Sequence, residues 1–205
     1  MSRLTTPSPF RAVRRITQPV VEPVSLSEIK QHLSILPEQV EDDAYLMALV
    51  SAARIVCEER LHMTFTATRW RAIATRFGQC ACSGVEMPYP PFLVDYEHPV
   101  QVTFTDADGV DHTVDEADIR TNTVEFPGRL QVRQTIANQC CETAAVVTWW
   151  GGVLRPSEVP SPIRAAIRRL VGRMYSDRGD DADRALEQDP ATEQLLAACS
   201  WIGRY

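Results

Sequence analysis

The fold of this chain is decided by residues 159–180, VPSPIRAAIRRLVGRMYSDRGD. Apolar side chains recur there at the spacing of a single helix face. They are Ile163, Ala166, Ile167, Leu170, Val171, Met174 and Tyr175. Ser161 is expected to cap the first turn, Pro162 stands where a helix tolerates proline, and Gly179 closes the segment. The stretch therefore predicts one amphipathic helix with its own start and stop signals.

Four arginines flank the apolar stripe of this helix. Arg164 and Arg168 lie on one side, and Arg169 and Arg173 lie on the other. Arginines in this position can contact the phosphates of DNA or pair with acids on a neighbour. The sequence leaves both interpretations open.

A second helical region lies near the front of the chain, at residues 24–63. Ser25 and Glu28 form a capping box that opens a short helix. A longer segment, 42–61, has apolar residues at helical spacing. The acidic residues 41–43 lie at its start, and carboxylates are favourable at a helix N-terminus. Small residues at 48, 51, 52 and 53 allow close approach of another backbone. The two segments predict an antiparallel helix pair.

Between the helical regions, residues 64–152 change to the period of strands. The expected strands are 66–73, 100–104, 110–114, 119–126, 130–132 and 144–150. The segment 106–109 (DADG) predicts a hairpin turn with Gly109 at positive φ, and it resembles a calcium loop only faintly. Trp149 and Trp150 are expected to pack against a helix, with base stacking as the alternative. This region predicts a small antiparallel β-sheet domain inserted into a four-helix, bundle-like module, an α+β fold.

The two ends of the chain differ in character. Residues 1–23 form a basic, Pro-rich lead-in that is interpreted as an arm outside the core. Residues 153–180 contain the third helix, and 181–205 an acidic linker followed by a C-terminal helix that opens at Pro190. Leu195, Leu196 and Ile202 fall on one face of that last helix, with Trp201 beside it.

Composition narrows the class of protein. The chain has 205 residues, 44% of them hydrophobic, and a net charge of −6, which argues against coating nucleic acid through its whole surface. No apolar run reaches the ~18 residues of a membrane span, and the N-terminus lacks the apolar region of a secretory signal. Synthesis in the cytoplasm and no membrane partner are therefore expected.

Motifs for catalysis are missing from the sequence. The four histidines show no ligand spacing, and there is no phosphate-binding glycine loop and no zinc-protease motif. His62 is interpreted as a structural residue near a helix C-terminus. Cys57 and Cys199 are expected to be buried, whereas Cys80, Cys82, Cys140 and Cys141 leave free thiols, a disulfide or a zinc site open. The expected protein is not an enzyme and uses no cofactor.

Three stretches in this order resemble the phage head–tail connector (adaptor, head-completion) family, in its larger version with a β-rich insertion. They are residues 24–61, the sheet core from MPYPPF at 87–92 to EFPGRL at 125–130, and 146–180, VVTWWGG to YSDRGD. The cysteine-bearing stretches and the long lead-in depart from the family pattern. The resemblance spans residues 24 to about 180.

The resemblance implies a structural virion protein. Members of that family form a ring, usually of twelve subunits, under the portal protein; the ring extends the channel for double-stranded DNA and carries the tail or a stopper protein. The expected partners are thus further copies, the portal, a tail or stopper protein and transiently DNA. Expected portal or neighbour contacts are Leu195, Leu196, Trp201, Ile202 and Tyr205; expected subunit or channel contacts are Arg54, Arg60, Arg164 and Arg168. The alternative function is a DNA-binding accessory factor that uses helix 162–175.

Overall fold

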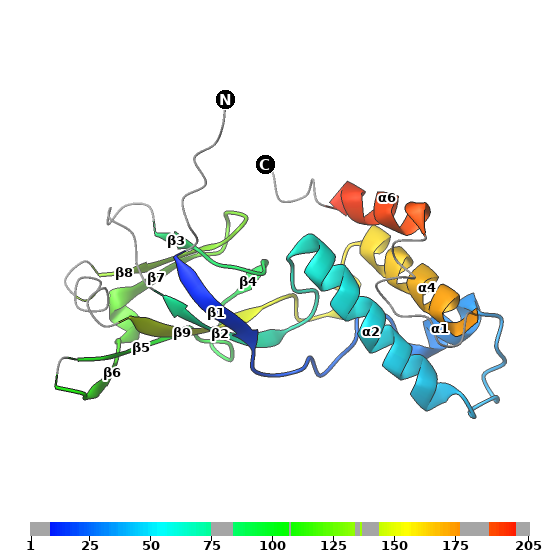
Figure 1. The fold of residues 1–205 in the computed structure, drawn as a ribbon, viewed down its shortest axis with the longest axis horizontal. Coiled ribbons are helices and arrows are strands. Elements are labelled where there is room, and N and C mark those ends of the chain that lie inside the picture. The colour runs from blue at the N-terminus through cyan, green and yellow to red at the C-terminus, as the bar shows by residue number, and fades with distance from the viewer. Residues whose placement is uncertain are drawn as a thin grey trace. The chain divides into compact units, whose positions relative to one another are not determined.

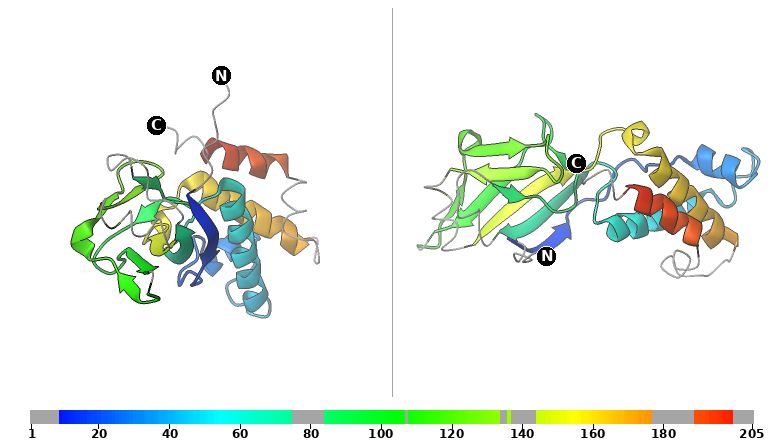
Figure 2. Two further views of the ribbon diagram at one scale, coloured as in Figure 1. Left: turned by 60° about the vertical axis from the view of Figure 1, so that its left-hand side comes forward. Right: turned by 90° about the horizontal axis from the view of Figure 1, so that it is seen from above.

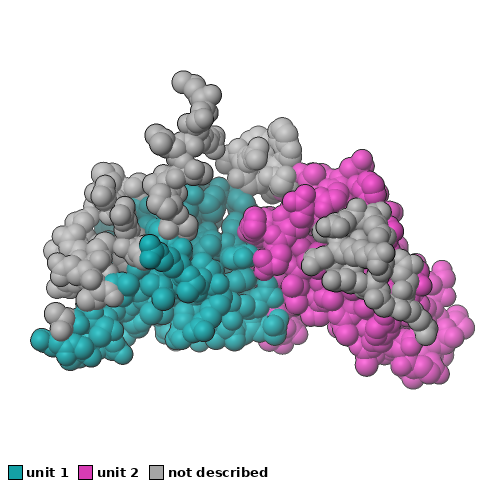
Figure 3. Space-filling model, in the orientation of Figure 1, with its two compact units in different colours: residues 1–18, 68–151 teal, residues 19–67, 152–205 magenta. Residues whose placement is uncertain are grey.

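The structure is a computed structural model that describes residues 9–74, 84–106, 108–133, 136, 144–176 and 189–199. The chain divides into two compact units (Figure 3). Residues 1–18 and 68–151 make the sheet unit, and residues 19–67 and 152–205 make the helical unit. Helices in one unit and antiparallel sheets in the other confirm the predicted α+β class.

The helical unit is built around the helix that the opening sequence stretch predicts. This helix, α4 (Ser161–Ser176), contacts α1 (Leu26–His32), α2 (Asp43–Leu61) and α6 (Pro190–Cys199). In Figures 1 and 2, α6 lies along α4 in every view. The apolar stripe of α4 is buried from Ile163 to Met174 and forms the centre of the core. The described residues thus contain the four expected helices, with a short 3₁₀ turn, η2 (Pro156–Glu158), ahead of α4.

Local sequence signals set most of the helix ends. The predicted capping box is confirmed, because the Ser25 hydroxyl accepts the amide of Glu28 while the Glu28 carboxylate accepts the amide of Ser25. His62 ends α2 in the left-handed conformation, at φ 52°. The predicted cap of α4 is wrong by one residue. Ser161 is already helical, and the Pro160 carbonyl accepts the amides of Ile163 and Arg164.

The sheet unit holds two antiparallel sheets. The larger has the order β1 (Phe10–Arg15), β2 (Thr68–Ala74), β9 (Ala145–Gly151), β5 (Gln101–Thr105), β6 (Asp111–Thr113), and β4 (Phe92–Leu93) also pairs with β9. The smaller has the order β3 (Val85–Glu86), β8 (Arg129–Val132), β7 (Ile119–Asn122), with the 3₁₀ turn η1 (Glu116–Asp118) ahead of β7. Figure 1 shows the order of the larger sheet.

The core of the sheet unit is formed by side chains from both sheets. Trp70, Val102, Val147 and Trp149 from the larger sheet cluster with Val85, Leu130 and Val132 from the smaller one. Trp149 is fully buried here, and its ring lies 6.0 Å from that of Phe10, centroid to centroid. The expectation that the tryptophan pair packs on a helix is therefore wrong for Trp149, because a second sheet supplies the apolar cover.

The interpretation of residues 1–23 as an arm outside the core is also wrong in part. Phe10–Arg15 form the edge strand β1, and Phe10 is buried. The guanidinium of Arg15 lies over the ring of Trp70. The register shifts between Arg11 and Arg14, and Ala12 adopts a φ of 50°. This bulge breaks the alternation of side chains by which a strand is recognised in a sequence.

The turn at 106–109 is the predicted hairpin turn between β5 and β6. The Asp106 carboxylate accepts the amides of Asp108 and Val110, and Gly109 has a φ of 82°. The second carboxylate oxygen of Asp106 lies 2.6 Å from Nε2 of His112. The carboxylate that a calcium loop would need is therefore occupied by the turn itself.

Candidate interaction surfaces

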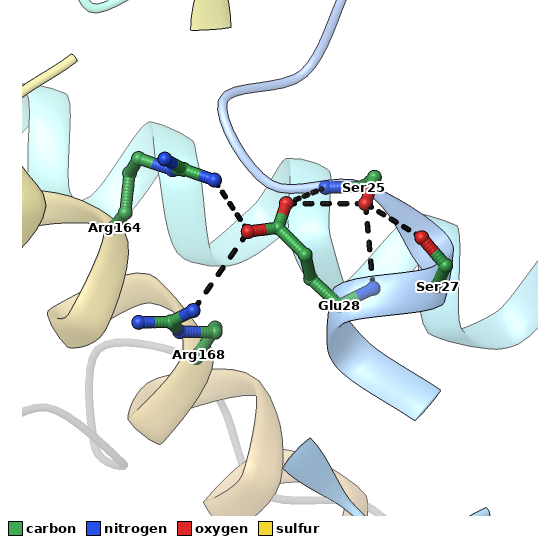
Figure 4. A network of polar contacts seen from close by, with 5 residues as sticks. All are labelled: Ser25, Ser27, Glu28, Arg164 and Arg168. Atoms are coloured by element: carbon green, nitrogen blue, oxygen red, sulfur yellow. Dashed lines mark hydrogen bonds and ion pairs between the residues drawn. The ribbon is translucent and has the colours of Figure 1, made fainter. Parts of the chain in front are cut away.

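The helical unit contains a polar network centred on Glu28, next to the N-terminus of α1. One Glu28 carboxylate oxygen closes the capping box with Ser25, and the other receives a hydrogen bond from Nη2 of Arg164 (Figure 4). Nη1 of Arg168 lies 3.8 Å from the same oxygen. Two of the arginines that flank the apolar stripe of α4 are thus directed at an acid of their own unit.

The ionised form of Glu28 is favoured by this network. Partial burial of the carboxylate opposes ionisation, but the hydrogen bonds from Ser25 and the charges of Arg164 and Arg168 outweigh it and lower the pKa of Glu28. The same contact ties α1 to α4. Arg164 and Arg168 therefore have a structural role in the helical unit, whatever else their exposed atoms contact.

Arg54 lies inside the helical unit and not on its surface. It is fully buried, and it donates hydrogen bonds of 2.7 Å each to Glu22 and to Glu58. Glu58 is buried too and accepts the amide of Phe65. The expectation that Arg54 lies at a subunit contact or the channel is therefore wrong, because its guanidinium is buried and enclosed by Glu22, Ser51 and Glu58 of its own chain.

Arg60 fits its predicted place on the surface better. Its side chain is 57% exposed, and both Nε and Nη2 lie 3.0 Å from the Glu193 carboxylate on α6. This hydrogen bond and the Glu193 charge raise the pKa of Arg60. The pair joins α2 to α6 while leaving much of the guanidinium accessible to a partner.

The N-terminus of α6 is fixed by a second ion pair. The Asp189 carboxylate accepts the Thr192 hydroxyl and the Ala191 amide, and Arg169 on α4 donates to both of its oxygens. Burial of Asp189 opposes ionisation, but these donors outweigh it and lower the pKa of Asp189 to about 2. Arg169 therefore holds α6 on α4.

The predicted portal-contact residues fall into three groups. Leu196 is 1% exposed and belongs to the core of the helical unit, so its assignment to an external contact is wrong. Leu195 is partly buried against the same core and keeps some exposed surface. Trp201, Ile202 and Tyr205 lie outside the described residues.

The outward face of α2 has no charged side chain over three turns. Ala44, Ala48 and Ile55 are exposed along it, and Ser51 and Ala52 are partly exposed. Ala53, one of the small residues noted in the sequence, points into the core. The cation of this segment, Arg54, is buried, so the usual arrangement of a surface helix is inverted. Such a face suits a close helix contact with another protein surface.

Sequence reasoning missed a basic surface on the sheet unit. Arg11 and Arg14 on β1 and Arg71 on β2 are exposed, and the pairing places Arg14 directly opposite Arg71. The alternation of β2, in which Arg69, Arg71 and Ile73 share a face, is visible in the sequence. The sequence pattern does not predict the strand β1, which pairs with β2 and brings Arg11 and Arg14 beside Arg71.

No metal centre is found within the part of the chain that the structure describes. Among those residues, no three histidine, cysteine, aspartate or glutamate side chains are placed to hold an ion. Cys57 and Cys199 are buried free thiols, and burial raises the pKa of Cys57 to about 12 and also raises that of Cys199. Cys80, Cys82, Cys140 and Cys141 lie outside the described residues.

No described helix has the length and apolar character needed to cross a membrane.

Comparison with solved structures finds the same fold in gene transfer agent (GTA) particles. A chain in the neck of an empty GTA particle, computed with C6 symmetry, superposes with a TM-score of 0.69 and 18% identity, over 92% of this chain and 94% of that one. A chain of the native GTA virion gives 0.65 and 17%, with coverage of 92% and 94%. A chain in the native neck, computed with C12 symmetry, gives 0.60 and 16%, with coverage of 90% and 94%. At these identities the likeness establishes the fold.

Comparisons with protein-family models and with curated proteins gave no match. The matched chains from the neck of GTA particles nevertheless cover 92% and 90% of this chain, so the likeness includes residues of both the sheet unit and the helical unit.

Proposed function

We propose that this chain is a structural subunit of a virion neck, a head–tail connector that joins the capsid portal to the tail. The observation that carries the proposal is the match of nearly the whole chain to chains from GTA particles, two of them from the neck itself. Three sequence stretches that resemble the connector family, in the family's order, support it independently. The role is to bind other virion proteins and not to convert a substrate.

In this role the chain forms a closed ring, a dodecamer, under the portal. The ring extends the channel for double-stranded DNA and offers a platform to the tail or a stopper protein. Identical subunits that pack head to tail close into a ring when the rotation between them allows it. The modest net negative charge suits a channel past which DNA slides without adhering.

Three groups of residues are assigned to contacts within this assembly. The uncharged outward face of α2 packs against the next subunit, and the exposed atoms of Arg60, Arg164 and Arg168 lie at subunit contacts or the channel wall. Leu195, together with Trp201, Ile202 and Tyr205, contacts the portal or a neighbour. The chain is made in the host cytoplasm and resides in the virion, at the junction of capsid and tail.

Replacement of Ala48 by arginine tests the α2 contact. The exposed position tolerates the larger side chain in the subunit, so folding is expected to be unchanged. Burial of a new charge against the next subunit is expected to abolish ring formation. Arg120→Glu, an exposed charge change in the sheet unit, is the control. Rings of normal size from the Ala48→Arg protein would remove α2 from the contact.

Deletion of the gene tests the function as a whole. A connector is required after the head is built, so infected or induced cells are expected to contain separate heads and tails. Electron microscopy of the lysate distinguishes these from joined particles, and supply of the wild-type chain from a plasmid is expected to restore joining. Normal numbers of complete, infectious particles without the chain would contradict the proposal.

The alternative function, DNA binding through the arginines of helix 162–175, has less support. Arg164 and Arg168 face Glu28, and Arg169 pairs with Asp189. Carboxylates of the same unit thus neutralise much of the charge that phosphates would need. Salt-dependent retention of the purified chain on DNA, lost when these arginines are replaced, would favour this alternative.

A further inference from the structure

The outer face of the larger sheet, opposite its core, carries a dense group of arginines. We call it the arginine face and define it by Arg11, Arg14, Arg69, Arg71, Ile73 and Trp150. Arg14 and Arg71 are directly opposite across β1 and β2, as are Arg11 and Ile73. Like charges in such opposed positions destabilise a sheet. Their presence here therefore calls for a partner that offsets the repulsion.

No carboxylate within the described residues pairs with Arg11, Arg14 or Arg71. Arg69 donates to the amide oxygen of Gln101. Two acids of the same unit have other partners, since Asp95 accepts from His98 and Asp111 accepts the hydroxyl of Thr105. The helical unit differs, because Arg54, Arg60, Arg164 and Arg169 each have a carboxylate partner there.

The composition of the arginine face favours a protein partner. Ile73 is 40% exposed and Trp150 is partly exposed between the arginines. Arginine, tryptophan and aliphatic side chains without lysine are typical of the central part of a protein–protein interface. Nucleic-acid surfaces are more polar and more evenly basic. The expected partner therefore presents carboxylates and apolar side chains together.

The chain itself carries a surface with that composition, in the link between α1 and α2 and the first turn of α2. We call it the 36–45 patch and define it by Leu36, Glu38, Val40, Glu41 and Tyr45. Leu36 and Val40 are 63% and 62% exposed, Tyr45 is exposed as well, and so are both glutamates. No described cation pairs with Glu38 or Glu41.

The 36–45 patch is held in shape by the single lysine of the chain. Lys30 is almost fully buried and donates to the carbonyls of Pro37 and Gln39, and its ammonium lies 2.6 Å from the Asp43 carboxylate. These contacts fix the link while Leu36 and Val40 stay exposed. A surface ordered in advance loses less entropy when it binds.

We propose that the arginine face of one copy binds the 36–45 patch of a second copy, with Arg14 and Arg71 opposite Glu38 and Glu41. Each surface would repel itself, so the contact is head to tail, the kind that generates a ring or an open chain of subunits. This inference rests on the proposed function and adds to it the surfaces that recognise one another.

Charge reversal in the full-length chain tests the contact. Two variants are made, Arg14→Glu/Arg71→Glu and Glu38→Arg/Glu41→Arg, and self-association is measured by sedimentation velocity at low salt. Each variant alone is expected to weaken self-association about tenfold or more, as for closely paired interface charges. A mixture of the two variants, and a chain carrying all four changes, are expected to regain it, because complementary pairs form again. Arg120→Glu and Glu116→Arg are the matched controls, and both are expected to behave as wild type.

The other outcomes would overturn the contact. These are a wild-type chain that stays monomeric at low salt, variants that associate normally, and reversed charges that fail to restore association in the mixture. Circular dichroism confirms that each variant is folded. Salt-dependent DNA retention that Arg14→Glu/Arg71→Glu removes, with self-association unchanged, would assign the arginine face to DNA instead. Failure here would leave the neck role standing, since that role is tested in particles and this contact in the purified chain.

Discussion

Arginine side chains in the helical unit connect segments that are far apart in sequence. Arg54 joins α2 to the segment before α1 through Glu22 and also pairs with Glu58 on α2, and Arg169 joins α4 to the start of α6 through Asp189. Ion pairs of this kind matter most where they are buried, because an unpaired buried charge is costly. Their consequences can be tested one residue at a time.

Arg54→Ala is expected to destabilise the chain by about 3–5 kcal/mol, since it leaves the buried Glu58 carboxylate without its cation. Urea unfolding measures the change in free energy. Arg120→Ala, a truncation of an exposed arginine, is the control and is expected to stay within about 0.5 kcal/mol of wild type. Equal stability of the two variants would contradict the buried position of Arg54.

Asp189→Asn is expected to lower stability at neutral pH, because the ionised carboxylate is favoured in the folded chain. The folded pKa of Asp189, about 2, lies below its ordinary value of 3.8. The stabilisation is therefore present above about pH 4 and is lost as the pH falls toward 2. Urea unfolding of both proteins across this range should show their difference in free energy shrinking with acidification. A difference that stays constant with pH would rule out a contribution from the charge.

Among the elements, β1 is a strand that the structure shows and that the sequence pattern does not predict. The strand carries a bulge at Ala12, so its side chains do not alternate regularly. What marks it as part of the sheet is the burial of Phe10 against Trp149, a residue 139 positions later by the sequence numbering. A contact so distant along the chain leaves no local signal.

Phe10→Ala tests the place of β1 in the sheet unit. Loss of a buried aromatic side chain is expected to cost about 3–5 kcal/mol. Because Phe10 lies beside Trp149, the tryptophan fluorescence of the folded chain is expected to change as well. Exposed Val124→Ala is the comparison variant, with no expected effect. If Phe10→Ala behaves like Val124→Ala, residues 1–23 are an arm after all.

The elements that the sequence predicts well are those with strong local signals. The Ser25–Glu28 capping box, the stripe of α4 and the turn ahead of Gly109 are all present. The paired sheets, the burial of Leu196 and the enclosure of Arg54 depend on partners distant in sequence, and they were missed. Leu196 and Arg54 were predicted at interfaces but are buried in the helical unit. Periodicity shows that a residue lies on an apolar face, but it does not show which surface covers that face.

For the whole molecule, the structure changes how the C-terminal contact must be tested. Removal of all residues from 190 onward would take away Leu196 and Cys199, which belong to the core of the helical unit. Such a chain is not expected to fold as the intact one does. Removal of residues 200–205 alone leaves α6 complete and separates the portal contact from stability.

The chain shortened by residues 200–205 is expected to keep its melting temperature and to lose binding to the portal. Pull-down of purified portal protein with each chain measures the loss. A chain with Arg120→Glu serves as the control and is expected to bind normally. Unchanged portal binding by the shortened chain would exclude Trp201, Ile202 and Tyr205 as the anchor.

The central claim is that this chain assembles into the neck of a virion. Electron cryomicroscopy of the purified particles, reconstructed about the axis of the junction between capsid and tail, tests it most directly. The account predicts a closed ring of density beneath the portal into which the sheet unit and the helical unit of this chain both fit. A well-resolved neck built entirely from other proteins would contradict it.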